Sequence, residues 1–174
     1  MQTMNMLLLM PPSFEPIKIA PGRKKTPDET GETQAIGRSR GGLSTKIHAT
    51  CDGLGNPTGF HLTPGQAHDL QGADVLLSRL ELEEVDALLA DKAYDAQQRV
   101  LDVLEQAQCE AVIPSKSNRK EPRDYDREKY KWRHLIENFF QKLKRYRGIA
   151  TRYDKTARNF LGGIHLAATV IWLN

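Results

Sequence analysis

The feature that most constrains the fold of this chain is an alternation of short apolar runs with segments of helical spacing. The run "EVDALLADKAYD" (84–95) is apolar and ends in charged residues, and "CEAVIPSK" (109–116) is a second such run. Short apolar runs of this length are typical of buried strands. The intervening "AQQRVLDVLEQAQ" (96–108) has helical spacing. The pattern therefore predicts two buried strands joined by a helix.

The segments on either side extend this arrangement. Residues 44–65 alternate polar and apolar side chains around the turn cluster "DGLGNP" and predict a β-hairpin. Residues 68–81 predict a helix with Asp69 as its N-cap, and further helices are expected over 130–148 and 157–173. The order β-β-α-β-α-β-α-α predicts an α/β fold with a mixed sheet flanked by helices.

The first 35 residues differ from the rest. The run "MLLLM" (6–10) is too short to span a membrane, and "PGRKKTPDETGET" (21–33) has turn chemistry without a hydrophobic period. We therefore expect residues 1–35 to be poorly ordered and residues 36–174 to form one domain. We also expect no targeting segment and no association with a membrane.

Positive charge is clustered, although the formal net charge is only +3. The clusters lie at 23–25, 38–40, 119–123 and 127–158, the last interleaved with aromatic residues. This arrangement suits a phosphate backbone, and a solvated basic face explains it equally well. The two cysteines, Cys51 and Cys109, show no zinc or disulfide spacing, which fits a reducing cytoplasm.

A polar stripe stands out in "YKWRHLIENFFQKLKRYRG" (130–148). Tyr130, Arg133, Glu137 and Lys144 follow one another at intervals of 3, 4 and 7, so in a helix they share one face. The stripe is either a functional surface or the solvated back of an amphipathic helix.

Asp91 ends the run "ALLA", and functional groups gather where the strands of such sheets end. An ordinary turn or cap role for Asp91 is the alternative. Together, Asp91 and Glu137 provide two carboxylates of the kind that hold Mg²⁺ in two-metal phosphoryl-transfer sites. Such a site normally needs a third carboxylate.

These residues resemble a known family. The spacing from Tyr130 to Lys144 matches the Y(2)R(3)E(6)K signature of insertion-sequence transposases with an RNase H-like DDE domain, and "ADKAYD" resembles the strand end that holds their second catalytic Asp. The blocks "IGRSRGGLSTKIHATCDGLGNP" and "GIATRYDKTARNFLGGIHLAATVIWL" are also similar to that family. The resemblance runs from about 34 to 174.

The resemblance implies roles for these residues. Asp91 would be the second and Glu137 the third metal ligand of a Mg²⁺ site that nicks the ends of the element and then lets the freed 3′-hydroxyl attack target DNA. The residues that would contact double-stranded DNA are Tyr130, Arg133, Lys144, Lys92, Arg38 and Arg40. For the Gly and Arg turn at 37–42, an ordinary loop is the alternative reading.

The chain departs from the family at its start. The family's first catalytic Asp lies in a strand of the type "IDAT" followed by "VRAH", and neither motif is present. Glu15, Asp28, Asp52 and Asp74 do not replace it convincingly. With permitted codons chosen for these residues, the frame that starts at the third base of the first codon yields "VIIDATIVRAH". We hypothesise that residues 1 to about 21 are translated out of frame and that the family frame resumes near Gly22. The nucleotide sequence of the gene tests this hypothesis.

Without the first strand, we expect a domain truncated at its N-terminus, an unpaired edge on the hairpin and a chain that is inactive alone. Frameshifting or a pseudogene would explain it. The alternative function is a non-catalytic DNA-binding fragment, or an inhibitor that forms mixed oligomers with the complete transposase. Homo-oligomers and a place on the bacterial nucleoid are expected for either function. An unrelated nuclease with the same fold is a third, weaker reading.

Overall fold

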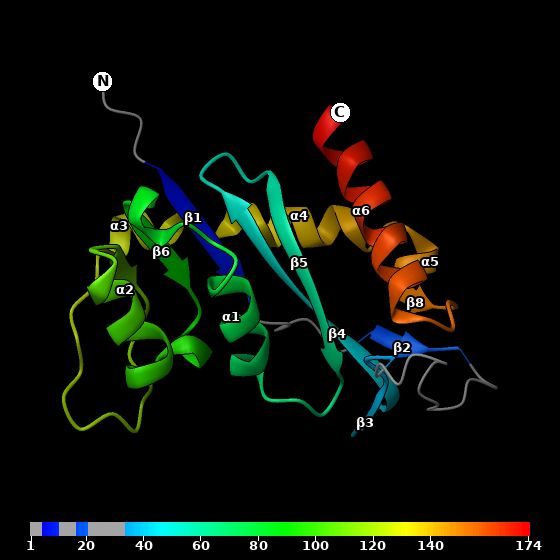
Figure 1. The fold of residues 1–174 in the computed structure, drawn as a ribbon, viewed down its shortest axis with the longest axis horizontal. Coiled ribbons are helices and arrows are strands. Elements are labelled where there is room, and N and C mark those ends of the chain that lie inside the picture. The colour runs from blue at the N-terminus through cyan, green and yellow to red at the C-terminus, as the bar shows by residue number, and fades with distance from the viewer. Residues whose placement is uncertain (1–4, 11–16, 21–33) are drawn as a thin grey trace.

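The computed structural model describes residues 5–10, 17–20 and 34–174 (Figure 1). Its strands are β1 (Met6–Met10), β2 (Ile17–Ile19), β3 (Gly37–Ser39), β4 (Gly42–Asp52), β5 (Pro57–Pro64), β6 (Ala87–Ala90), β7 (Glu110–Val112) and β8 (Thr151–Arg152). Its α-helices are α1 (Asp69–Leu77), α2 (Asp102–Gln106), α3 (Arg127–Lys131), α4 (His134–Leu143), α5 (Arg147–Ala150) and α6 (Ala157–Leu173). Short 3₁₀ turns η1 (Leu82–Glu84) and η2 (Lys92–Tyr94) and a π-turn η3 (Gln97–Leu101) connect them.

The strands form one mixed sheet. Its order is β7-β6-β1-β4-β2-β8, and β3 and β5 also pair with β4. β1 runs parallel to β6 and antiparallel to β4, and β6 runs parallel to β7. The sheet carries helices on both faces, with α1 on one face and α4 on the other (Figure 1). The predicted α/β class with a mixed sheet is confirmed, and the arrangement is consistent with an RNase H-like fold.

Strand β1 corrects one expectation. Residues 1–35 were expected to lack regular order, yet β1 lies between β6 and β4, and β2 pairs with both β4 and β8. The physical reason is the apolar run itself, since Leu8 and Leu9 are fully buried and their burial stabilises the strand whatever its coding origin. The edge of β4 that faces β1 is therefore paired. The basic cluster at 23–25, Glu15 and Asp28 lie outside the described residues.

Side chains of β1 alternate between two cores, as the period of a strand requires. Leu8 packs with Ile136 and Phe140 of α4, while Leu7 and Leu9 pack with the cluster that includes Leu76 of α1. β6 follows the same alternation, because Leu89 belongs to the α4 core and Leu88 and Ala90 belong to the α1 core. This alternation decides which strand positions face α4.

The helix predicted over 130–148 is interrupted. α3 ends at Lys131, α4 begins at His134, and the link is tightened by i to i−3 hydrogen bonds from the amides of Trp132, Arg133 and Leu135. The predicted N-cap of α1 is also wrong by one residue. The His68 side chain, rather than that of Asp69, accepts the hydrogen bond from the Leu70 amide at 3.3 Å. The predicted hairpin and the helix over 157–173 are confirmed.

A buried histidine links the sheet to α1. His48 of β4 is fully buried, and its Nε2 lies 2.8 Å from the Thr63 hydroxyl. Helix α1 packs on the imidazole through Gly72, where a Cβ atom would lie 2.2 Å from Nδ1. Burial lowers the pKa of His48 from 6.5 to about 4, against the raising influence of Asp69. The ring is therefore neutral in the folded protein at neutral pH.

This histidine should make the fold sensitive to acid. Between pH 6.5 and 4 the unfolded chain binds a proton that folded His48 does not, so stability falls as pH decreases across this window. The slope from one such group is at most about 1.4 kcal/mol per pH unit, and the total loss is on the order of 3 kcal/mol. Urea unfolding of the protein and of His48→Gln at pH 7 and 4.5 measures the loss. An equal loss in both proteins would contradict the assignment.

Candidate active site

Asp91 is held at the carboxyl end of β6. The strand is buried throughout, and the Asp91 Oδ1 atom accepts a hydrogen bond of 3.0 Å from the Ala93 amide at the start of η2. The other oxygen, Oδ2, faces Arg133 at 3.9 Å. The turn role that was the alternative for Asp91 is therefore real, and it leaves one carboxylate oxygen directed at the neighbouring helix.

Glu137 approaches from the first turn of α4. Arg133, immediately before α4, forms an ion pair with Glu137 through Nη2, while Nη1 of the same guanidinium faces Asp91. The side chains of Asp91, Arg133 and Glu137 are each partly shielded, with 25%, 18% and 34% of their surface exposed. The two predicted carboxylates thus meet across one cation, although they are 46 positions apart in the chain.

Tyr130 completes this group from α3. The guanidinium carbon of Arg133 lies 5.5 Å from the centre of the Tyr130 ring, and Tyr125 packs edge-on against that ring at 5.4 Å. Burial raises the pKa of the Tyr130 hydroxyl, and Arg133 opposes the rise while Asp91 adds to it. Despite the break between α3 and α4, three members of the predicted stripe are gathered at Asp91.

The donor set suits a hard cation in kind but is incomplete in number. Carboxylate oxygens are the ligands that Mg²⁺ prefers. Across residues 5–10, 17–20 and 34–174, however, no group of three acidic, His or Cys side chains is placed to share a metal ion. Arg133 neutralises the two acids instead, and its buried Nη1 has no hydrogen-bond acceptor among the described residues. The residues present therefore fit part of a metal site.

Comparison with known proteins agrees with this geometry. The family described as "Transposase DDE domain" matches residues 20–173. The chain belongs to this family of DDE transposases. It is also similar to a Brucella ovis protein named "Putative transposase for insertion sequence element IS6501", with 41% identity over 131 residues, which is 75% of this chain and 99% of the relative. No solved structure matches significantly.

The remaining predicted DNA contacts of this DDE transposase chain lie outside the Asp91 and Glu137 pair. Lys144 caps α4, two turns beyond Glu137, and Lys92 is exposed next to Asp91. Arg38 and Arg40 are exposed at the turn between β3 and β4. Arg38 pairs with Leu43, while position 10 pairs with Ala49, so about 20 Å of β4 separates the turn from the level of Asp91.

One basic residue of the transposase sequence has a structural role. Arg152, inside the predicted basic cluster, is fully buried, donates to the Thr45 hydroxyl at 2.7 Å and lies 4.9 Å above the Phe160 ring. Burial lowers the pKa of its guanidinium to about 10, which leaves it charged at neutral pH. Arg152 joins β8, β4 and α6, and it cannot reach DNA from this position.

Sequence reasoning missed Asp95, the last residue of "ADKAYD". Its side chain is almost fully buried and binds the basic loop 114–123 through the guanidinium of Arg119, the Lys116 amide at 2.8 Å and Arg123 at 3.9 Å. The signal was present as an acid four residues after Asp91, followed by a basic loop. In this transposase domain the motif has two functions, since Asp91 faces α4 and Asp95 anchors the loop.

Strand β1 of this transposase domain brings position 10 to the level of Asp91. In the parallel pairing of β1 with β6, Leu9 lies opposite Ala90, so position 10 follows at the level of Asp91. In the out-of-frame reading, the Asp codon spans the codons of Leu9 and Met10. β1 therefore supplies a strand beside β6, and its residues Met6–Met10 include no carboxylate.

Proposed function

We propose that this chain is the catalytic part of an insertion-sequence transposase that cleaves phosphodiester bonds at the element's ends and joins the freed 3′-hydroxyl to target DNA. The observation that carries the proposal is the meeting of Asp91 and Glu137 across Arg133 at the carboxyl end of β6. Membership of the DDE transposase family supports the reaction class.

Asp91 and Glu137 would hold Mg²⁺, which supplies charge stabilisation at the reacting phosphate. The chain's own residues orient the acids. The Ala93 amide fixes one oxygen of Asp91, and Arg133 keeps both carboxylates on the same side of α4. We propose that Arg133 and Lys144 contact DNA phosphates with Tyr130 beside them, and that Lys92, Arg38 and Arg40 extend this contact along double-stranded DNA.

We infer that residues 1 to about 21 are read out of frame and that the chain is inactive alone. The family match begins at residue 20, close to the proposed return to frame at Gly22. β1 contributes apolar burial but no carboxylate on the side of α4. Our proposed division remains an N-terminal segment 1–35, which includes β1 and β2, and a catalytic domain 36–174.

The alternative function is a non-catalytic DNA-binding fragment, or an inhibitor that occupies transposon ends or joins the complete enzyme in mixed oligomers. The absence of a third metal-binding carboxylate from the described ranges favours it. Either protein would act on DNA in the bacterial cytoplasm, on the nucleoid, as a homo-oligomer or a mixed one. No helix in the part of the chain that the structure describes has the length and apolar character to cross a bilayer.

DNA binding without cutting is the expected behaviour of the purified chain. It should bind a 40-base-pair duplex with an affinity that falls steeply with salt, because cations contact phosphates. It should yield no nicked product with Mg²⁺ or Mn²⁺ on supercoiled plasmid. Absence of DNA binding at low salt would contradict the proposed function. If the unaltered chain nicks the plasmid and Asp91→Asn does not, the active site is complete in this chain and the expectation of inactivity is wrong.

A further inference from the structure

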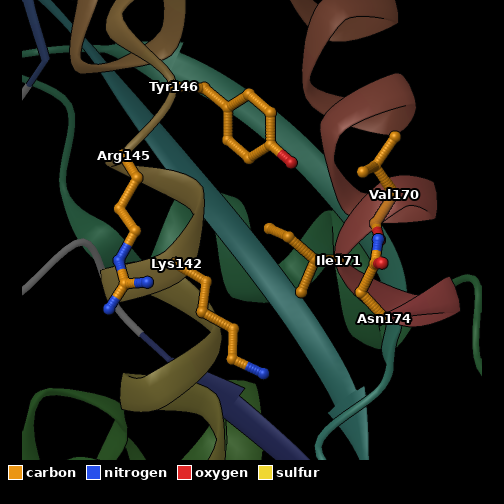
Figure 2. A pocket seen from close by; sticks show the side chains of 6 residues that line it. All are labelled: Lys142, Arg145, Tyr146, Val170, Ile171 and Asn174. Atoms are coloured by element: carbon orange, nitrogen blue, oxygen red, sulfur yellow. The ribbon is translucent and has the colours of Figure 1, made fainter.

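A groove separates the end of α4 from the last turns of α6. Its main hollow has a volume of about 350 Å³ and is lined by Lys142, Arg145, Tyr146, Val170, Ile171 and Asn174. Figure 2 shows Lys142 and Arg145 on the α4 side and Val170, Ile171 and Asn174 on α6, with the Tyr146 ring between the two sides. A second hollow of about 340 Å³ shares Lys142, Arg145 and Ile171 and continues to Leu54 and Trp172.

The two cations of this groove have no carboxylate partner among the described residues. Lys129, Lys131 and Arg133 on the preceding segment each have a carboxylate partner. Within the described ranges, neither Lys142 nor Arg145 forms an ion pair or a side-chain hydrogen bond, and no acidic residue lines either hollow. The charge of the groove is therefore available to an anion from solution.

Aromatic side chains accompany these cations. Tyr146 is 37% exposed and Trp172 is 64% exposed, and each lines one of the two hollows. Unpaired cations beside exposed aromatic residues are typical of surfaces that bind nucleic acid. An acidic peptide would satisfy the charge as well, but a chain whose family acts on DNA meets a continuous row of phosphates. The charge complementarity of the groove therefore favours a DNA backbone.

The groove is distinct from the stripe that carries Glu137. Lys142 follows Glu137 by five residues, which turns it by about 140° around the axis of α4. Arg145 lies just beyond Lys144, the residue that caps α4. We propose that this groove binds the phosphate backbone of duplex DNA outside the Asp91 and Glu137 site, as a second contact. The inference rests on the proposed function, which makes DNA the substrate.

The test compares two double variants for binding of a 40-base-pair duplex. Lys142→Gln with Arg145→Gln removes the groove cations, and Arg79→Gln with Arg99→Gln removes the same charge from two exposed positions outside the basic clusters. Each phosphate contact contributes about −0.9 to the slope of log affinity against log salt. The groove variant should therefore lose about 1.8 from the slope, and the control variant should keep the slope of the unaltered chain.

A second readout places DNA at the groove. The chain has 2 tryptophans, so Trp132→Phe leaves Trp172 as the reporter. Its fluorescence should change on DNA binding and should not change when the groove cations are also replaced.

Equal slopes for the two double variants, together with Trp172 fluorescence that does not change on DNA binding, would overturn the proposal that the groove binds DNA. DNA binding by the unaltered chain would still support the proposed function. A dimer that persists in sedimentation with DNA bound, together with equal slopes, would assign the groove to a second copy instead. If the unaltered chain binds no DNA, both proposals fail.

Discussion

Replacing Met10 by aspartate should give the chain a Mg²⁺-dependent nicking activity that the unaltered protein lacks. The register of β1 places position 10 next to Asp91 on β6, since Leu9 lies opposite Ala90. Because alternate residues of a strand point to the same face of the sheet, an aspartate at position 10 would point to the same face as Leu8. Leu8 packs in the core beneath α4, the helix that carries Glu137. Three carboxylates would then share one site, and we expect at least about a 100-fold increase in plasmid nicking.

Two variants control this experiment. Met10→Asn has nearly the same shape as Met10→Asp without its charge and should stay inactive. Met10→Asp combined with Glu137→Gln should lose the gained activity, because the third ligand is then missing. Thermal unfolding of each protein identifies any variant that does not fold. A folded Met10→Asp protein that binds DNA but leaves the plasmid intact would contradict the placement of the first ligand.

Replacing Asp95 by asparagine should destabilise the domain by about 2–4 kcal/mol. The Asp95 carboxylate is buried and is the shared partner of Arg119, Arg123 and the Lys116 amide. An amide cannot neutralise the two guanidinium groups, and its nitrogen is a donor facing other donors. Since both arginines retain some exposure, water compensates for part of the lost interaction, which keeps the cost below that of a fully buried pair.

Urea denaturation measures this cost, and limited trypsin digestion reports on the loop over 114–123, which should be cut faster in the variant. Glu121→Gln is the matched control, because it removes one negative charge from an exposed position of the same loop. Its unfolding midpoint should equal that of the unaltered chain. If Asp95→Asn also kept that midpoint, Asp95 would not anchor the loop.

Much of the fold follows from local patterns. The hairpin, the buried strand before Asp91 and the helix over 157–173 each have an unambiguous period, and the structure contains all three. The break between α3 and α4 could not be predicted, because neither Pro nor Gly interrupts the helical spacing there. Strand β1 was missed for a different reason. Five apolar residues become a strand here through pairing with both β4 and β6, which local sequence does not reveal.

In the candidate site, too, some residues could be predicted from local sequence and others could not. Asp91 and Glu137 could be selected from a strand end and a helix stripe, and the structure brings them together across Arg133. Asp95 was missed because its role depends on burial against a loop about 20 residues later, which no spacing rule encodes. Arg152 has the charge of a DNA contact, and only its burial shows that it belongs to the core.

Anomalous diffraction from crystals of Met10→Asp soaked in Mn²⁺ would test the assignment of Asp91 and Glu137 as metal ligands most directly. We expect a Mn²⁺ peak bound by the carboxylates of Asp91, Glu137 and the introduced aspartate, with Arg133 displaced from between the two native acids. A peak elsewhere, or an unmetallated site in which Arg133 still bridges Asp91 and Glu137, would contradict the assignment of these two residues as metal ligands.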